Sequence, residues 1–293
     1  MTTTPPPATD SHFSLLPPSL RIGIVHLAVS DLGRAVSFYQ RVVGLQVEEE
    51  AAGRADLRVG GAPLLALTER PGARRVRHHA GLYHFALLVP TRAALARALG
   101  RLIETGTPFA SADHLVSEAL YLSDPDGNGI EIYRDRPREE WPFVKGRLQM
   151  DTLPLDLTDL LRAGEGADAE EEGLAPGTRM GHVHLHVSGI AEAERFYRDV
   201  MGFELMQRFG ATASFLSAGG YHHHVAVNVW AGVGVPPAQP DAVGLVWFEI
   251  VIPETEERDR LRARLDAAGV PVSDRPESFF VRDPAGNGIV VRG

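Results

Sequence analysis

The sequence predicts an α+β protein built from four consecutive βαβββ units. The first observation is an internal repeat: residues 23–46, GIVHLAVSDLGRAVSFYQRVVGLQ, align without a gap with residues 181–204, GHVHLHVSGIAEAERFYRDVMGFE. The second is another pair of related segments, since residues 83–99 resemble residues 246–261 and SDPDGNGIEIY resembles RDPAGNGIVVR. The two halves of the 293-residue chain are therefore related, and each half contains two units.

Each unit is expected to begin with a strand in which apolar and polar residues alternate. In the first and third units a Ser-containing turn follows, which can cap a helix of the form AxxFYxxVxG that ends at a glycine. In this helix Phe38 and Tyr39 match Phe196 and Tyr197. Three further strands complete each unit, which gives approximate spans of 21–70, 81–135, 179–231 and 244–293.

Two segments lie outside the four units. Residues 1–20 are rich in Pro, Thr and Ser and are expected to form a flexible N-terminal arm. Residues 136–178 connect the two halves, and they combine one short ordered piece with the acidic stretch GEGADAEEEGLAPG. That stretch is expected to be a solvated loop.

Composition excludes several classes of function. The net charge of -9 and the absence of any Lys- or Arg-rich cluster argue against nucleic acid as a partner. The absence of cysteine excludes disulfides, thiolate metal sites and cysteine nucleophiles, so any metal must be bound by His and carboxylate. No apolar run is long enough to span a membrane and no signal peptide is evident, so a soluble cytoplasmic protein without a membrane partner is expected.

The segment DHLVSEALYLSDPDGNGIEIY, residues 113–133, carries the clearest functional motif. It contains a His, an apolar residue followed by Tyr, an Asp-Pro, a Gly and a Glu in one register: His114, Leu120, Tyr121, Asp124, Pro125, Gly127 and Glu131. This pattern resembles that of the type I extradiol ring-cleaving dioxygenases of the vicinal oxygen chelate superfamily (glyoxalase, bleomycin resistance and extradiol dioxygenase proteins), and two-domain catechol 2,3-dioxygenases in particular. Ala112 departs from the family pattern, which usually has Gly, Asn, Thr or a β-branched residue there.

The resemblance implies the vicinal oxygen chelate fold, in which two units side by side form an open, cup-shaped sheet of eight strands. Alternate side chains of each strand face the inside of the cup, where ligands from different strands converge. The expected organisation is a flexible arm over 1–20, an N-terminal cup with the metal site over 21–135, the connector 136–178, and a C-terminal cup over 179–293.

The same resemblance implies that His26, His84 and Glu131 bind a metal, as two imidazoles and one carboxylate do in non-haem Fe(II) oxygenases. Fe(II) is the expected cofactor, with Mn(II), Ni(II) or Zn(II) as alternatives. The implied function is an iron-dependent oxidoreductase of aromatic catabolism that cleaves a catechol-type vicinal diol with O2. His114 is the expected acid/base residue, and Tyr121 the residue that donates a hydrogen bond to a substrate oxygen.

Related enzymes often have another active-site His at the start of the last strand of the first unit, which is residues 60–69 here and contains none. His78 or His79 could reach in from a loop, a single acid/base residue could suffice, or the chemistry could differ. Asp124, Asp126 and Asn128 are expected to build the turn before the Glu131 strand.

The second half keeps one of the three expected ligands, because the counterparts are His184, Trp247 and Val290. A structural role is therefore expected for it. However, His222, His223 and His224, with His182, His184 and His186 on the first strand of the same unit, could form a second metal or anion site, or a polar interface. Strand alternation would place His222 and His224 on one face and His223 on the other. Paired sheet edges would make a homodimer.

Two other functions fit the same superfamily. A glyoxalase-type isomerase or lyase would use Ni(II) or Zn(II) and a fourth ligand on the last strand of the first unit, where only Glu69 could serve. A small-molecule binding or resistance protein would perform no chemistry and would commonly have lost its ligands. The metal content of the purified protein separates the second possibility from the enzymes.

Overall fold

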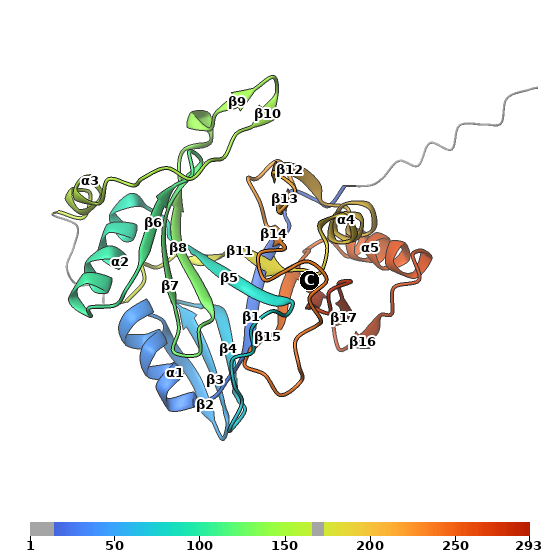
Figure 1. The fold of residues 1–293 in the computed structure, drawn as a ribbon, viewed down its shortest axis with the longest axis horizontal. Helices are drawn as coiled ribbons and strands as arrows, with labels where there is room; N and C mark the ends of the chain where they lie inside the picture. The colour runs from blue at the N-terminus through green and yellow to red at the C-terminus, as the bar shows by residue number, and fades with distance from the viewer. Residues whose placement is uncertain (1–14, 166–172) are drawn as a thin grey trace, which may run out of the picture.

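Two eight-stranded sheets organise the computed structural model, which describes residues 15–165 and 173–293 (Figure 1). Sheet A has the order β16-β17-β18-β15-β1-β4-β3-β2. Its strands are β1 (Arg21–Val29), β2 (Gln46–Ala51), β3 (Arg54–Val59), β4 (Ala62–Glu69), β15 (Gly244–Val251), β16 (Ser273–Arg275), β17 (Ser278–Arg282) and β18 (Gly288–Arg292). Sheet A therefore combines the first and fourth units.

Sheet B combines the second and third units, in the order β12-β13-β14-β11-β5-β8-β7-β6. Its strands are β5 (Gly81–Leu88), β6 (Ala110–Asp113), β7 (Ser117–Ser123), β8 (Gly129–Asp135), β11 (Arg179–His186), β12 (Glu204–Phe209), β13 (Ala213–Ser217) and β14 (Val225–Asn228). In each sheet the first strands of the two units pair antiparallel at the centre, β1 with β15 and β5 with β11. The four βαβββ units of the predicted vicinal oxygen chelate fold are confirmed.

The pairing of the units differs from the expected division into cups over 21–135 and 179–293. Each unit presents its first strand as an edge that needs a partner, and four related units offer more than one equivalent edge. The repeat alone does not show which of these strand edges pair with each other. Units of the same half instead contact each other through a helix and a turn: the Tyr39 hydroxyl donates to Asp124 Oδ2 (2.9 Å) and the Tyr197 hydroxyl to Asp283 Oδ2 (3.0 Å).

Helices cover the outside of both sheets, with α1 and α2 on the left of Figure 1 and α4 and α5 on the right. The helices are α1 (Leu32–Phe38), α2 (Arg92–Glu104), α3 (Leu157–Arg162), α4 (Ile190–Glu194) and α5 (Thr255–Ala267). Both α1 and α4 continue as π-helical turns, Tyr39–Val43 and Arg195–Met201, and end at the predicted glycines. Gly44 has φ of 90° and Gly202 has φ of 96°, a conformation that favours glycine.

The expected turn before the Glu131 strand is present and recurs in the other half. Asp124 accepts hydrogen bonds from the backbone N–H of Asp126 and Asn128 and from the Asn128 side chain (2.8–2.9 Å). Asp283 makes the same set of contacts with Ala285 and Asn287. The Asp126 side chain instead reaches the first unit, where it accepts from Ser30 and pairs with Arg34.

The arm and the connector are more ordered in part than expected. Residues 1–14 and 166–172 lie outside the described residues, but Leu16 and Leu20 are buried, and the Leu16 N–H donates to the Gly202 carbonyl (3.0 Å). The connector contains a short 3-10 turn (Arg138–Glu140) and the hairpin of β9 (Phe143–Val144) and β10 (Arg147–Leu148). No helix in the described part of the chain is long and apolar enough to cross a membrane.

Candidate functional site

Three buried side chains converge on the concave face of sheet B: His84 on β5, Glu131 on β8 and His182 on β11. Their ligand atoms all lie within 4.8 Å of one another. Glu131 Oε2 is 3.1 Å from His84 Nε2 and 2.9 Å from His182 Nε2, and the two Nε2 atoms are 3.4 Å apart. Within the described residues this is the single group that could hold a metal ion.

The strand register explains why these residues meet. In the antiparallel pair of β5 and β11, Phe85 lies opposite Val183, so that His84 and His182 occupy equivalent positions on either side of the sheet centre. Glu131 pairs with Ala86 on the neighbouring parallel strand. Because side chains at alternate positions share a face, the two imidazoles and the carboxylate all point into the same cup.

The protonation states suit metal binding. Burial lowers the pKa of His182 to about 4, although the neighbouring Glu131 carboxylate opposes the shift, so this imidazole is neutral near pH 7. Burial alone would raise the pKa of Glu131, but the contacts with His182 and His84 outweigh it and hold the pKa well below the usual range. A metal needs this combination of neutral imidazole and ionised carboxylate in its ligands.

The arrangement fits a divalent metal. Adjacent ligands at right angles around a metal, with bonds of about 2.1 Å, are about 3.0 Å apart, and the three separations here are 2.9, 3.1 and 3.4 Å. This fit rests on the positions of the donor atoms themselves. Two imidazoles and one carboxylate form the donor set of non-haem Fe(II) oxygenases.

His26, which the sequence analysis expected as a ligand, lies in the other sheet. Its Nε2 is 2.7 Å from the Thr68 hydroxyl, and its ring packs edge-on against Trp247 at 4.9 Å. In sheet A, His26 corresponds to His184 and not to His182, as the pairing of His26 with Trp247 and of His184 with His84 shows. The structure therefore brings His84 and Glu131 together with His182 in place of His26.

A glyoxalase-type site would use a fourth protein ligand, and the residue at the related position cannot provide one. The position related to Glu131 in the third unit is Ala226, which pairs with His184 as Glu131 pairs with Ala86. Alanine cannot coordinate a metal. Glu69, the residue considered for this role, lies at the end of β4 in sheet A, where it accepts a hydrogen bond from the Leu32 N–H (3.0 Å).

His114 and Tyr121 lie beside the three candidate ligands, as expected from the motif. His114 Nδ1 is 2.7 Å from the Asp151 carbonyl, which can only accept, so Nδ1 carries the proton. The other nitrogen, Nε2, is then the acceptor of the Tyr121 hydroxyl at 2.6 Å. Burial and the Glu131 charge raise the pKa of Tyr121 well above its usual range, so it remains a hydrogen-bond donor.

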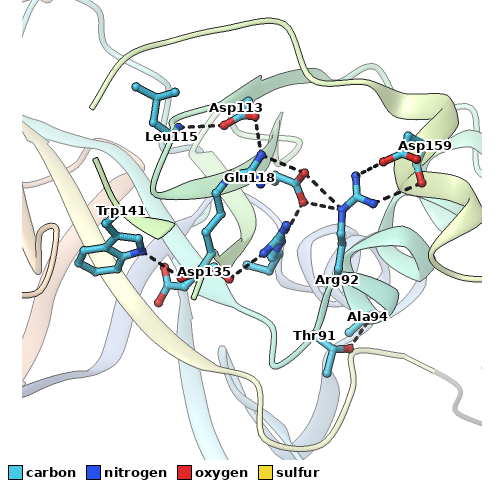
Figure 2. Close-up of polar contacts among 11 residues, drawn as sticks. Thr91, Arg92, Ala94, Asp113, Leu115, Glu118, Asp135, Trp141 and Asp159 are labelled. Atoms are coloured by element: carbon cyan, nitrogen blue, oxygen red, sulfur yellow. Dashed lines mark hydrogen bonds and ion pairs between the residues drawn. The ribbon is translucent and has the colours of Figure 1, made fainter. Parts of the chain in front are cut away.

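The turn that carries His114 is held by an ion-pair network on the outer face of sheet B (Figure 2). Asp113 Oδ1 accepts the Leu115 N–H (2.8 Å), which stabilises Leu115 at φ 70°, and Asp113 Oδ2 pairs with Arg136 (2.5 Å). The buried Glu118 carboxylate joins Arg136, Arg134 and Arg92. These contacts fix the backbone on either side of His114.

Three histidines of the third unit lie at this site, His182 as a candidate ligand and His184 and His223 in the cavity lining. Residues 222–224 precede β14, which begins at Val225, so strand alternation does not apply to them. His223 faces the cavity, and its ring centroid is 4.0 Å from that of His182. His222 Nε2 contacts Asp135 (2.9 Å), and His224 Nδ1 contacts Ser217 (3.0 Å).

The sequence analysis looked for a second active-site histidine at the start of the last strand of the first unit, residues 60–69, whereas His223 precedes β14, the last strand of the third unit. The third unit is the one that pairs with the second. Burial, and then the neighbouring His182, lowers the pKa of His223 well below the usual range. The loop residues His78 and His79 are not among the residues that line the cavity, and His78 Nδ1 instead donates to the Ala231 carbonyl.

A cavity of about 430 Å³ is lined by two of the three candidate ligands, His84 and Glu131, and Glu131 contacts the third, His182, at 2.9 Å. Its volume is within the range of about 300–1,000 Å³ that is typical of small-molecule sites. Its lining includes Tyr83, His84, His114, Tyr121, Glu131, His184, His223 and Trp230. Sequence reasoning identified His84, His114, Tyr121 and Glu131, whereas it assigned His182 and His223 only to a separate second site.

Comparisons with known proteins agree with this fold. The profile of the Glyoxalase/Bleomycin resistance protein/Dioxygenase superfamily matches residues 21–132 and 179–291. The chain is 45% identical to catechol-2,3-dioxygenase of Bacillus subtilis (strain 168), over 90% of this chain and 93% of that protein. It is 26% identical to 2,2',3-trihydroxybiphenyl dioxygenase of Sphingomonas paucimobilis, over 87% of this chain and 81% of that protein.

A similar fold is found in a solved structure. Glyoxalase I from Zea mays superposes with a TM-score of 0.56 at 15% identity, over 93% of this chain and 92% of that one. At this identity the likeness supports the fold alone. From the repeated units, the two cups and the match of both halves to one profile, this chain belongs to the Glyoxalase/Bleomycin resistance protein/Dioxygenase superfamily, the vicinal oxygen chelate proteins.

Proposed function

We propose that this protein is a non-haem Fe(II) extradiol dioxygenase that cleaves a catechol-type vicinal diol with O2, and that His84, Glu131 and His182 hold the iron. The observation that carries the proposal is the convergence of three buried ligand atoms beside a cavity that His84, Glu131, His114 and Tyr121 line. The 45% identity to a catechol-2,3-dioxygenase over nearly the whole chain supports the same reaction class.

When bound, Fe(II) supplies open coordination positions and the one-electron chemistry through which a catechol and O2 react. The side chains that surround it have separate tasks. His84, Glu131 and His182 would hold the metal, and Ala226 offers no fourth protein donor. The metal would then keep positions for the substrates.

His114 and Tyr121 present one acceptor and one donor to a catechol hydroxyl. The Asp151 carbonyl keeps the proton of His114 on Nδ1, so that Nε2 can accept a proton from the substrate. The Tyr121 hydroxyl, now 2.6 Å from this nitrogen, can donate to the resulting oxyanion. His114 can later return the proton as the ring opens, and His223, next to His182, provides a second group for proton transfer.

Two observations argue against the other functions of the superfamily. Ala226 removes the fourth ligand that a glyoxalase-type site would use. A binding protein without chemistry would have no need for a buried His-Glu-His group, because a buried charge is costly unless it is paired or coordinates a metal.

The test is reconstitution of the metal-free protein with Fe(II) under anaerobic conditions, followed by catechol in air. We expect about one iron per chain, a yellow ring-cleavage product, and one O2 consumed per catechol. Mn(II), Ni(II) and Zn(II) loaded in parallel identify the metal that supports turnover. Glu131→Gln should abolish iron binding and product formation, whereas Glu69→Gln, the same change in sheet A, should retain both.

Two results would overturn the proposal. Stoichiometric iron without O2 uptake for any of several catechols would indicate a different reaction at the same metal. Full activity of Glu131→Gln would place the metal elsewhere in the molecule.

A further inference from the structure

We infer that the substrate is a catechol whose ring carries no anionic substituent. This inference rests on the proposed function and concerns the same cavity. The argument has three parts: the charges that line the cavity, the character of its walls, and the ion pairs that occupy the nearest cations.

The cavity lining offers no cation to a carboxylate. Of the described residues that line it, none is Arg or Lys. The carboxylates of the lining are Glu131, which faces His84 and His182, and Asp151, which lies in the segment over the cavity. An anionic group on the substrate would find no guanidinium or ammonium partner in the lining and would lie near the Glu131 and Asp151 carboxylates.

Two opposing walls of the cavity are apolar. On one side lie small and aliphatic residues, Ala110 and Ala112 on edge strand β6 and Val116 in the following loop. Opposite them lie the aromatic rings of Phe209 on edge strand β12 and Phe215 on β13. A ring substituent that extends away from the metal position therefore contacts hydrocarbon, which favours apolar groups.

A strap over residues 149–153 links the two edges of the half-open sheet. The Met150 N–H donates to Gln207 Oε1 (2.7 Å) and Gln207 Nε2 donates to the Met150 carbonyl (2.8 Å), which ties the strap to β12. At the other end, Leu153 and Asp113 exchange two backbone hydrogen bonds of 2.9 Å, which tie it to β6. The strap shields this end of the cavity from water, and a charge there would be poorly solvated.

Three arginines close to the β6–β8 side of sheet B are already paired on its outer face. Strand alternation sends Glu118 and Arg134 to the side opposite Tyr121 and Glu131. Glu118 contacts Arg92, Arg134 and Arg136, and Arg136 also contacts Asp113 (Figure 2). A guanidinium that left this network to meet a substrate would leave the Glu118 carboxylate buried without its full set of partners.

The test compares two catechols of similar shape and different charge. In 4-propylcatechol and 3,4-dihydroxyphenylacetate the substituents are of similar size, and the methylene group separates the carboxylate from the reacting ring. With the iron-loaded protein we expect kcat/KM for the anionic catechol to be lower by about 100-fold or more, because a poorly solvated carboxylate without a cation is costly. Unsubstituted catechol serves as the reference substrate.

A charge variant makes the test sharper. Thr152 is exposed, lies in the strap and lines the cavity. Thr152→Arg should raise the ratio of kcat/KM for the anionic over the neutral catechol by about 10-fold, and Thr152→Gln, of similar length without the charge, should leave the ratio unchanged. If both variants change the ratio equally, the effect is steric and the charge argument fails.

The outcomes separate this inference from the proposed function. If neither catechol nor 4-propylcatechol is cleaved, the proposed function fails, and the substrate class fails with it. If both substituted catechols are cleaved with kcat/KM values within about 3-fold, the function stands and the inference is overturned. A ratio of about 100-fold that falls in Thr152→Arg but not in Thr152→Gln supports both.

Discussion

Sheets A and B are built from the same units with the same strand order, yet their concave faces differ at every position that matters for chemistry. In sheet B the three converging ligands are His84, Glu131 and His182. The positions related to them by strand register in sheet A hold Trp247, Val290 and Ile24. None of these three can coordinate a metal, so the fold supplies the cup and a few side chains decide whether it can carry a metal.

The difference extends to the residues around the ligands. Tyr121 pairs with Glu131 in sheet B, and the related pair in sheet A is Phe280 with Val290. Phe280 has lost the hydroxyl, and the guanidinium groups of Arg275 and Arg282 lie over its ring at 4.6 and 5.1 Å. A position used for a hydrogen-bond donor in one cup is therefore an apolar surface for cation packing in the other.

The loop before this strand also differs between the two cups. The loop from β6 to β7 has three residues, His114, Leu115 and Val116, whereas the loop from β16 to β17 has the two residues Pro276 and Glu277. Sheet A thus lacks the longer loop that places His114 beside the cup of sheet B. Under the proposed function, sheet A would stabilise the molecule and the chemistry would take place in sheet B.

The largest expected effect is the difference in iron binding and turnover between alanine variants of His182 and His26. His182→Ala should abolish stoichiometric iron binding and lower kcat by at least about 1,000-fold, because the metal supplies the reaction. His26→Ala should keep iron and turnover and lose about 1 kcal/mol of unfolding free energy, through its contact with Thr68. Iron analysis, steady-state kinetics and urea denaturation measure the three quantities. If His26→Ala loses iron and His182→Ala does not, the comparison of the two cups is reversed.

A smaller effect is expected from the turn that holds His114. Asp113→Ala removes both the acceptor of the Leu115 N–H and the partner of Arg136, so His114 should be mispositioned and kcat should fall by about 10-fold, with a smaller change in KM. Asp113→Asn keeps an acceptor for the N–H and should recover most of the loss.

The matched control for this prediction is Asp274→Ala, on the edge strand of sheet A, where Asp274 pairs with Arg262 on the surface. It should leave kcat and KM unchanged. A pH profile of kcat/KM separates positioning from general destabilisation, since mispositioning of His114 changes the limb that reports the acid/base residue. Equal activities of Asp113→Ala and the wild type would show that the turn does not need this carboxylate.

Much of the fold could be predicted from the sequence, because each unit signals itself locally. The alternating strand, the helix that ends at Gly44 or Gly202 and the Asp-Pro turn all depend on residues close in the chain. The pairing of the units could not be predicted from the sequence, because it depends on which of several similar strand edges meet. That choice is made by contacts distant in sequence, such as those between β5 and β11.

The site could also be predicted only in part. Glu131, His84, His114 and Tyr121 all lie within the second unit, and their spacing placed them correctly around one cavity. The third candidate ligand, His182, comes from the partner unit, and the assignment to His26 followed from the assumed pairing of units. The signal that could have pointed to His182 was the alternation of His182, His184 and His186, which places three imidazoles on one face of a first strand.

The smallest expected effects test whether the two halves are joined in equivalent ways. Tyr39→Phe and Tyr197→Phe each remove one hydrogen bond to a buried aspartate, from contacts of 2.9 and 3.0 Å. Each change should lower the unfolding free energy by about 1–2 kcal/mol, because the aspartates keep their other partners. Only Tyr39→Phe should also affect turnover, by about 3-fold at most, since Asp124 begins the turn that leads into the Glu131 strand. Denaturation curves and kcat measured on both variants decide this. If Tyr197→Phe slows turnover as much as Tyr39→Phe does, then the cup without ligands contributes to the chemistry, and the division of roles between the two sheets is wrong.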